Sequence, residues 1–233
     1  MYIEITSSLE QMSDTTWLQR AASALQAFRK SDHPGVSLAR DLLWVVAVVG
    51  CIALALYLFA GTWPAVVTIE SESMVPNMNV GDLVMVVDKD RFGGLVTCSE
   101  GQMTGYRAFG EYGDVIIYRP NGVDSVHPII HRAMVYVDTA AVEQSALGEY
   151  YEDPHGGYIT RGDNNPYVDQ GSLWIPDVGM VEPVREEWII GKALFAVPLI
   201  GYLPLHLVEF AVFVIVIIII HDFVLARRRK KDE

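Results

Sequence analysis

The sequence predicts a mainly β domain that is held at a membrane by an apolar helix at each end. Three observations predict this fold class: two long apolar segments flank the centre of the chain, short β-rich runs fill the segment between them, and no helical period is sustained there. The predicted parts are a cytoplasmic segment at 1–41, a transmembrane helix at 42–63, an extracytoplasmic β-rich domain at 64–200, a second transmembrane helix at 201–226 and a basic cytoplasmic tail at 227–233.

The first apolar segment, residues 42–59, carries no charge, and Trp63 follows it. A helix of about 20 residues spans the roughly 30 Å hydrocarbon core of a bilayer. The second segment, within 203–225, contains the run FAVFVIVIIII. A buried core helix is the alternative for each run, but both runs are longer and more apolar than a core helix of a soluble protein usually is. Because about 40 residues precede the first run, we expect an uncleaved anchor rather than a signal peptide.

Basic residues flank both segments on their outer sides. Four precede the first segment and five follow the second, namely Arg20, Arg29, Lys30 and Arg40, then Arg227, Arg228, Arg229, Lys230 and Lys231. Basic flanks remain in the cytoplasm. The sequence therefore predicts a two-pass protein of the cell membrane, with both termini cytoplasmic and lipid as a partner.

The domain between the anchors is acidic. Residues 64–192 contain eight Lys and Arg against 20 Asp and Glu, whereas the rest of the chain is balanced. This surface repels phosphate and argues against nucleic acid as a partner. The chain has 12 Arg and only five Lys. An acidic, lysine-poor surface suits high salt, where self-repulsion is screened, and this favours a halophilic archaeon as the source.

Runs rich in Val, Ile and Tyr predict the strands of this domain: 83–87, 115–119, 133–137, 157–160 and 172–176. The segments 92–112 and 139–156 are rich in Gly, Glu and Tyr and are expected to be surface loops or insertions. The two cysteines, Cys51 and Cys98, lie in different parts of the chain, so we expect no disulfide. Neither has metal-ligand spacing, and we expect no metal and no cofactor.

Ser73 is the candidate nucleophile of the β-rich domain. It lies soon after the first apolar segment, in the polar turn SESMVP. A serine in such a turn is more often only a turn former. Nucleophilic catalysis also needs a base. His131, in the apolar run PIIHRAM, is the best placed histidine, although an isolated case would more often be a core histidine bound to a carbonyl.

A carboxylate is needed to orient the imidazole. The stretch RGDNNPYVD supplies Asp163 and Asp169, six residues apart. A turn-forming Asp that binds backbone is the default interpretation for Gly-Asp-Asn-Asn, and from the residues alone either acid could fill the role.

Four boxes in order, SESMVPNM, VGDLVMV, PIIHR and RGDNNPYVDQ, resemble the type I signal peptidases, specifically the archaeal and endoplasmic-reticulum branch. The resemblance covers roughly residues 65–177. It implies an all-β catalytic domain and a membrane-bound serine endopeptidase that cuts N-terminal signal peptides from secreted preproteins after an Ala-x-Ala pattern. The partners that it implies are those signal peptides and the protein-secretion channel.

The resemblance also implies the roles of the residues. Ser73 is the nucleophile, His131 the general base, and Asp169 the acid that orients it, with Asp163 in support. The backbone N–H of Ser73 and the hydroxyl of Ser71 meet the oxyanion.

The chain departs from the family pattern in two places. Glu72 stands where glycine is usual, and it would be strained if that position needed positive φ. The interval from His131 to Asp163 is long, and 139–156 is the expected insertion. Two alternatives stay open: a non-catalytic docking subunit of a secretion complex, and a Ser–Lys enzyme, although neither Lys89 nor Lys192 stands at the base position.

Overall fold

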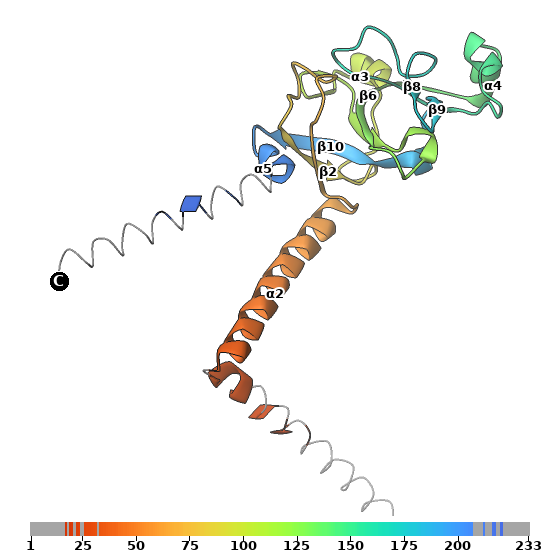
Figure 1. Cartoon of the computed structure of the whole chain (residues 1–233). Helices are drawn as coiled ribbons and strands as arrows, with labels where there is room; N and C mark the ends of the chain where they lie inside the picture. Colours follow the sequence, from red (N-terminus) through yellow and green to blue (C-terminus); the bar gives the residue numbers. More distant parts are fainter. Residues whose placement is uncertain are drawn as a thin grey trace, which may run out of the picture. The chain divides into compact units, whose positions relative to one another are not determined.

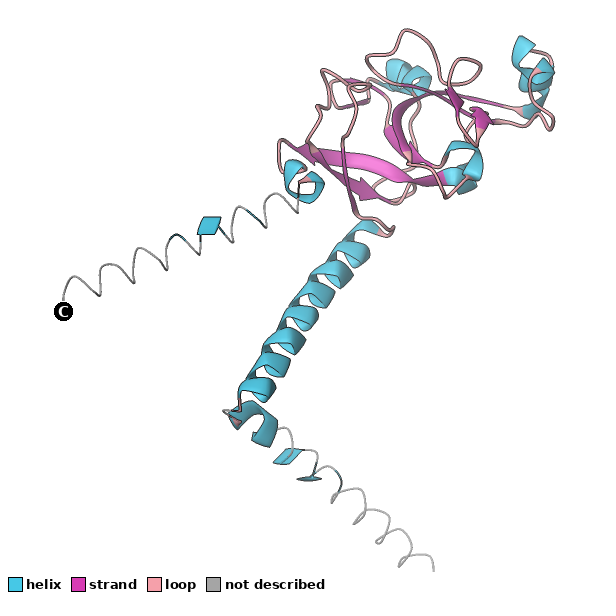
Figure 2. Ribbon diagram, viewed as in Figure 1, coloured by secondary structure: helices cyan, strands magenta, loops and turns pink. Residues whose placement is uncertain are grey.

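A computed structural model describes residues 17, 19–20, 22–23, 26–31 and 33–206, and the separate positions 212, 216–217 and 220. The chain divides into two compact units, Met1–Leu56 and Tyr57–Glu233. The mainly β fold class is confirmed, together with an apolar helix near the N-terminus (Figure 2). Of the second predicted transmembrane helix, 201–226, the structure describes residues 201–206, which contain the short helix α5 (Tyr202–Leu205), and positions 212, 216–217 and 220. The rest of that segment and the basic tail lie outside the described residues.

Helix α2 (Pro34–Ala60) contains the first apolar segment. Proline suits a first helical position because its missing N–H needs no partner there. Among the described residues, Gly35–Ala60 is the one stretch of helix long and apolar enough to cross a membrane by length and composition. At 1.5 Å per residue it exceeds the roughly 30 Å of a bilayer core. Its apolar side chains are exposed, which favours lipid around them.

A six-stranded antiparallel sheet forms the centre of the second unit, in the order β1-β2-β10-β5-β6-β7 (Figure 1). Its strands are β1 (Val66–Thr68), β2 (Leu83–Val87), β5 (Val115–Tyr118), β6 (Ile129–Val137), β7 (Gly157–Arg161) and β10 (Ile189–Val197). Two small hairpins add β3 (Arg107–Ala108) with β4 (Glu111–Tyr112), and β8 (Trp174–Ile175) with β9 (Gly179–Met180).

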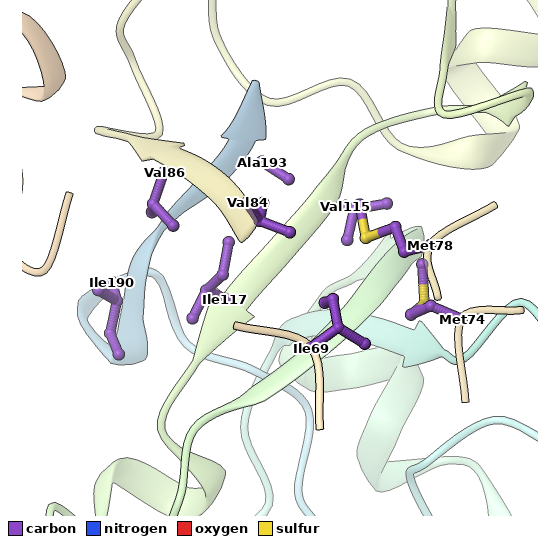
Figure 3. Close-up of a cluster of buried hydrophobic side chains, with 9 residues drawn as sticks. All are labelled: Ile69, Met74, Met78, Val84, Val86, Val115, Ile117, Ile190 and Ala193. Carbon is purple, nitrogen blue, oxygen red and sulfur yellow. The ribbon is translucent and has the colours of Figure 1, made fainter. Parts of the chain in front are cut away.

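Both faces of strand β5 are buried, so all four of its residues are inside. Val115 and Ile117 pack into one core cluster, which β2, β10 and the segment 69–78 complete (Figure 3). Ile116 and Tyr118 pack into a second cluster on the other face. This alternation follows from the two-residue period of a strand. It places the phenol of Tyr118 in the interior, where its hydroxyl needs a partner.

The predicted strands at 83–87, 115–119, 133–137 and 157–160 correspond to β2, β5, β6 and β7, although β6 begins earlier, at Ile129. The run at 172–176 holds the short strand β8. The long strand β10 was not predicted. Its residues continue toward the second apolar segment, so they did not stand out as a separate strand run.

The segments 92–112 and 139–156, expected to be surface loops or insertions, are not loops throughout, because each contains a short helix: α3 (Cys98–Thr104) and α4 (Thr139–Glu143). The signals were caps rather than a helical period. Thr97 and Glu100 form a capping box, and Asp138 accepts a hydrogen bond from the N–H of Ala141. Helices this short do not fill a periodicity window.

Candidate active site

Ser73 lies in a tight loop that the hydrophobic core holds in place. The N–H groups of Asn77 and Met78 donate to the carbonyl of Met74 at 2.9 and 3.0 Å, and the two methionine side chains are buried in the first core cluster. Figure 3 shows Met74 and Met78 beside Val115. The hydroxyl oxygens of Ser71 and Ser73 are 3.1 Å apart. The methionines therefore fix the loop while it presents both serine hydroxyls at its surface.

Glu72 does not strain this loop. The φ of Glu72 is not in the positive region, where a side chain would be strained. The substitution of the usual glycine is therefore compatible with an ordinary turn.

His131 lies on β6, where it pairs with Ile116 of β5, and it is 5% exposed. Its Nδ1 is 2.7 Å from Oδ2 of Asp169, which is 2% exposed. When Nδ1 carries the proton and donates it to the carboxylate, Nε2 is left with a lone pair. This is the tautomer that a general base needs.

Gly162 lies where the serine loop and the histidine approach each other. The Cβ of any side chain there would be 2.6 Å from the carbonyl oxygen of Ser73 and 2.9 Å from Nε2 of His131. The two atoms are therefore separated by no more than the sum of those distances. The N–H of Asn164 also donates to the Ser73 carbonyl at 2.8 Å. The structure thus brings together residues that are far apart in the sequence.

Asp163 has a different set of contacts from Asp169. It accepts two hydrogen bonds from Arg132, at 2.7 and 2.6 Å, and one from Nδ2 of Asn77 at 2.8 Å. The same guanidinium donates to the carbonyls of Ala108 and Gly113. Asp163 therefore ties the residue after the histidine to the serine loop, while Asp169 binds the imidazole itself.

Sequence reasoning missed two residues of this site. Tyr118 and Thr160 each donate a hydroxyl to Oδ2 of Asp169, at 3.0 and 2.6 Å. Burial, and then the nearby carboxylate, raise the pKa of Tyr118 well above its ordinary value of 10.0, so this hydroxyl remains protonated. The only signal in the sequence was a polar group inside each of two apolar strand runs.

The two lysines considered as alternative bases are engaged elsewhere. Lys89 Nζ is 3.0 Å from a carboxylate oxygen of Glu186. Lys192 Nζ donates to the carbonyl of Gly93 at 2.6 Å and lies 3.8 Å from Asp114. Within the described part of the chain, no group of three or more His, Cys, Asp or Glu side chains could hold a metal ion.

No family model matches the chain. Among curated proteins, its relatives include the signal peptidase complex catalytic subunit sec11 of Aspergillus terreus, which is 26% identical over 157 residues, or 66% of this chain and 71% of the relative. The subunit of the same name from Aspergillus oryzae is 26% identical over 158 residues, with the same shares. That of Aspergillus fumigatus is 26% identical over 157 residues, covering 66% and 70%. The chain is therefore a homologue of the signal peptidase complex catalytic subunits, in the branch of type I signal peptidases that its ordered sequence boxes resemble.

Proposed function

We propose that the chain is a membrane-bound serine endopeptidase that removes signal peptides from secreted preproteins. Its homologues support signal-peptide cleavage, and its apolar helix supports membrane association. The observation that carries the proposal is the contact between Nδ1 of His131 and the buried carboxylate of Asp169, on the far side of the ring from the serine loop. A core histidine with only a structural role would be satisfied by a backbone carbonyl and would not need a carboxylate.

In the proposed mechanism, the Oγ of Ser73 attacks the scissile carbonyl while Nε2 of His131 accepts its proton. The ring then delivers this proton to the leaving amine, and the acyl-enzyme is hydrolysed by water. Asp169 keeps the proton of the resting ring on Nδ1 and stabilises the imidazolium that forms during each transfer. Because Asp169 is buried, its charge acts through little water and is weakly screened.

The oxyanion would be met by the backbone N–H of Ser73 and the hydroxyl of Ser71. The 3.1 Å between the two Oγ atoms supports this role, because it keeps the second hydroxyl near the reacting oxygen. One such donor is typically worth about 2.7–4 kcal/mol in the transition state. Asp163 supports the site by binding both Arg132, next to the histidine, and Asn77 of the serine loop, rather than by contact with the ring.

The finer parts of the proposal concern the substrate and the setting. We expect small residues at the first and third positions before the cut, in the Ala-x-Ala pattern. The domain would lie outside the plasma membrane, with both termini in the cytoplasm, two membrane passes, and lipid and the secretion channel as partners. The basic residue Arg40 at the start of the apolar stretch of α2 supports this orientation.

The test is cleavage of a preprotein with an Ala-x-Ala site by membranes that contain the full chain. Ser73→Ala should abolish the cleavage, and Ser71→Ala should slow it by about a hundredfold or more. Ser125→Ala is the matched control, because this serine is exposed and outside the site. Cleavage by the Ser73→Ala chain at the wild-type rate would refute the assignment. Binding of the preprotein without cleavage by the wild-type chain would favour the docking subunit instead.

A further inference from the structure

Two hydroxyl groups converge on the carboxylate oxygen that binds His131. Oδ2 of Asp169 is 2.7 Å from Nδ1 of the histidine, 2.6 Å from Oγ1 of Thr160 and 3.0 Å from the hydroxyl of Tyr118. The short contact to Thr160 is in the range of charge-assisted O–H···O⁻ bonds. One oxygen atom therefore receives three donors, of which only the histidine belongs to the proposed triad.

The three donors come from three neighbouring strands of the central sheet. Tyr118 ends β5, His131 lies on β6 between them, and Thr160 lies on β7. Tyr118 pairs with Ile129 of β6, and Thr160 with Ala133. Both hydroxyl-bearing residues are 0% exposed. The register of the sheet therefore sets the position of each hydroxyl. Because both residues are fully buried, solvent water does not reach these positions.

Thr160 is itself held in one orientation. Its N–H donates to Oε1 of Gln170 at 2.9 Å, and its Oγ1 accepts from Nε2 of the same amide at 3.2 Å. The carbonyl of Thr160 accepts from the N–H of Asp169 at 2.8 Å. Oγ1 also lies 3.1 Å from the hydroxyl of Tyr118, but its contact with the charged carboxylate is shorter, at 2.6 Å, so the single proton of the threonine hydroxyl is directed to Asp169. Tyr118, which burial keeps protonated, likewise acts as a donor.

Donors on a carboxylate take up part of its negative charge. The share taken by the two hydroxyls is no longer available to stabilise a protonated imidazole. With both hydroxyls in place, Asp169 orients the ring while part of its charge is shared with Thr160 and Tyr118. A general base works best when its pKa lies close to the working pH.

We propose that Tyr118 and Thr160 are positioning residues that act through Asp169: they fix the carboxylate against His131 and set the pH below which the base is lost. This inference rests on the proposed function. The alternative is a purely structural role, in which the two hydroxyls only satisfy the hydrogen-bonding needs of buried polar groups in the core. The two possibilities differ in pH dependence, because a purely structural role has no reason to move the acidic limb of the activity profile.

The other charged groups near the ring stay in place in this comparison. Arg132, the next residue on β6, is paired with Asp163. Arg161 on β7 is the register partner of Arg132. Asp169 is the carboxylate in contact with the ring. None of these residues is substituted in the hydroxyl variants, so a shift of the acidic limb reports on the loss of the hydroxyl and its effect on Asp169.

The experiment measures kcat/KM for an Ala-x-Ala substrate across pH 4.5 to 9 with the full chain in membranes. Tyr118→Phe and Thr160→Val should each move the acidic limb to higher pH by about 0.5 to 1 unit, and lower the plateau by about three- to tenfold. Thr160→Ser, which restores a hydroxyl, should return the limb toward its wild-type position. Tyr151→Phe is the matched control, because that buried hydroxyl donates at 3.0 Å to the carbonyl of Val181 and should leave the limb unmoved.

An unmoved limb in both Tyr118→Phe and Thr160→Val would overturn the inference, whatever happens to the plateau. If Tyr118→Phe fails to fold, Thr160→Val and Thr160→Ser decide the question alone, because they alter the same carboxylate oxygen. Failure of the proposed function is distinguished by Ser73→Ala: if that variant cleaves normally, the protease assignment fails. If it is inactive while the limbs stay fixed, the protease assignment stands and only this inference falls.

Discussion

Replacement of Gly162 by alanine tests whether the serine loop and the histidine depend on their close approach. The added methyl group would lie 2.6 Å from the carbonyl oxygen of Ser73, 2.8 Å from Nδ2 of Asn165 and 2.9 Å from Nε2 of His131. Cβ atoms essentially never come closer than 3.0 Å to a non-bonded heavy atom of another part of the chain. The amide of Asn165 could turn away, but the first contact is with backbone.

The size of the effect follows from these contacts. An ordinary contact begins near 3.4 Å, so the Ser73 carbonyl must retreat by most of an ångström from its present distance. A displacement of about 1 Å in a catalytic geometry can cost about a hundredfold in rate. Overpacking of a filled site also destabilises a fold by about 1–3 kcal/mol. We expect kcat/KM of Gly162→Ala to fall by about 30- to 100-fold, with a lowered Tm.

The assay is cleavage of an Ala-x-Ala preprotein well below the Tm of both variants, so that the loss of rate is separated from unfolding. Gly94→Ala is the matched control: a Cβ there meets no atom within 4 Å, and its φ is not in the left-handed region. It should retain wild-type kcat/KM. If Gly162→Ala is as active as this control, the close approach of the two segments does not matter for activity, and the reasoning from Gly162 fails.

Two further predictions concern the roles of the two acids and the cap of helix α3. Asp169→Asn should lower kcat by about 10⁴-fold with little change in Tm. Asp163→Asn should mainly lower stability, by about 3–5 kcal/mol, because it leaves the buried guanidinium of Arg132 without its counter-charge. Measurement of kcat and Tm for both variants tests this, and the reverse pattern would exchange the roles of the two acids. Thr97→Ala should destabilise the fold by about 1 kcal/mol through loss of the cap of α3. Hydrogen bonds from Thr97 lower the pKa of Glu100, so the stability that they add is present above the ordinary pKa of the carboxyl and is lost as pH falls through the lowered value. The Tm difference between wild type and Thr97→Ala should therefore narrow in acid. A Tm difference that stays constant with pH would argue against the capping box of Thr97 and Glu100.

Local patterns predicted much of the β domain. Strands β2, β5 and β7 were predicted because each is a run rich in β-branched or aromatic residues and has turn residues near its ends. Strand β10 was missed because its residues continue without a break toward an apolar segment, so no local signal marked it as a strand of the sheet. The caps at Thr97 and Asp138 were readable in the sequence, but they carry weight only when short helices are considered.

The candidate site divides in the same way. The order of the boxes was enough to select Ser73, His131 and the two acids. The partners of Asp169 could not be predicted, because Tyr118 and Thr160 reach it only through the register of β5, β6 and β7. Pairing between strands is a long-range property, and no local pattern records it. The close fit at Gly162 likewise depends on two loops that meet only in the folded chain.

The anchoring of the serine loop by Met74 and Met78 has a consequence for how this protein tolerates change. Both side chains are almost completely buried, and they share their cluster with strands β2, β5 and β10. Repacking deep inside the domain, for example at Ile117, would therefore tilt the loop and misalign its hydroxyl while the sheet still holds together. Activity should be more sensitive than thermal stability to interior substitutions on this face. A loop anchored at two such points is also poorly suited to act as a gate.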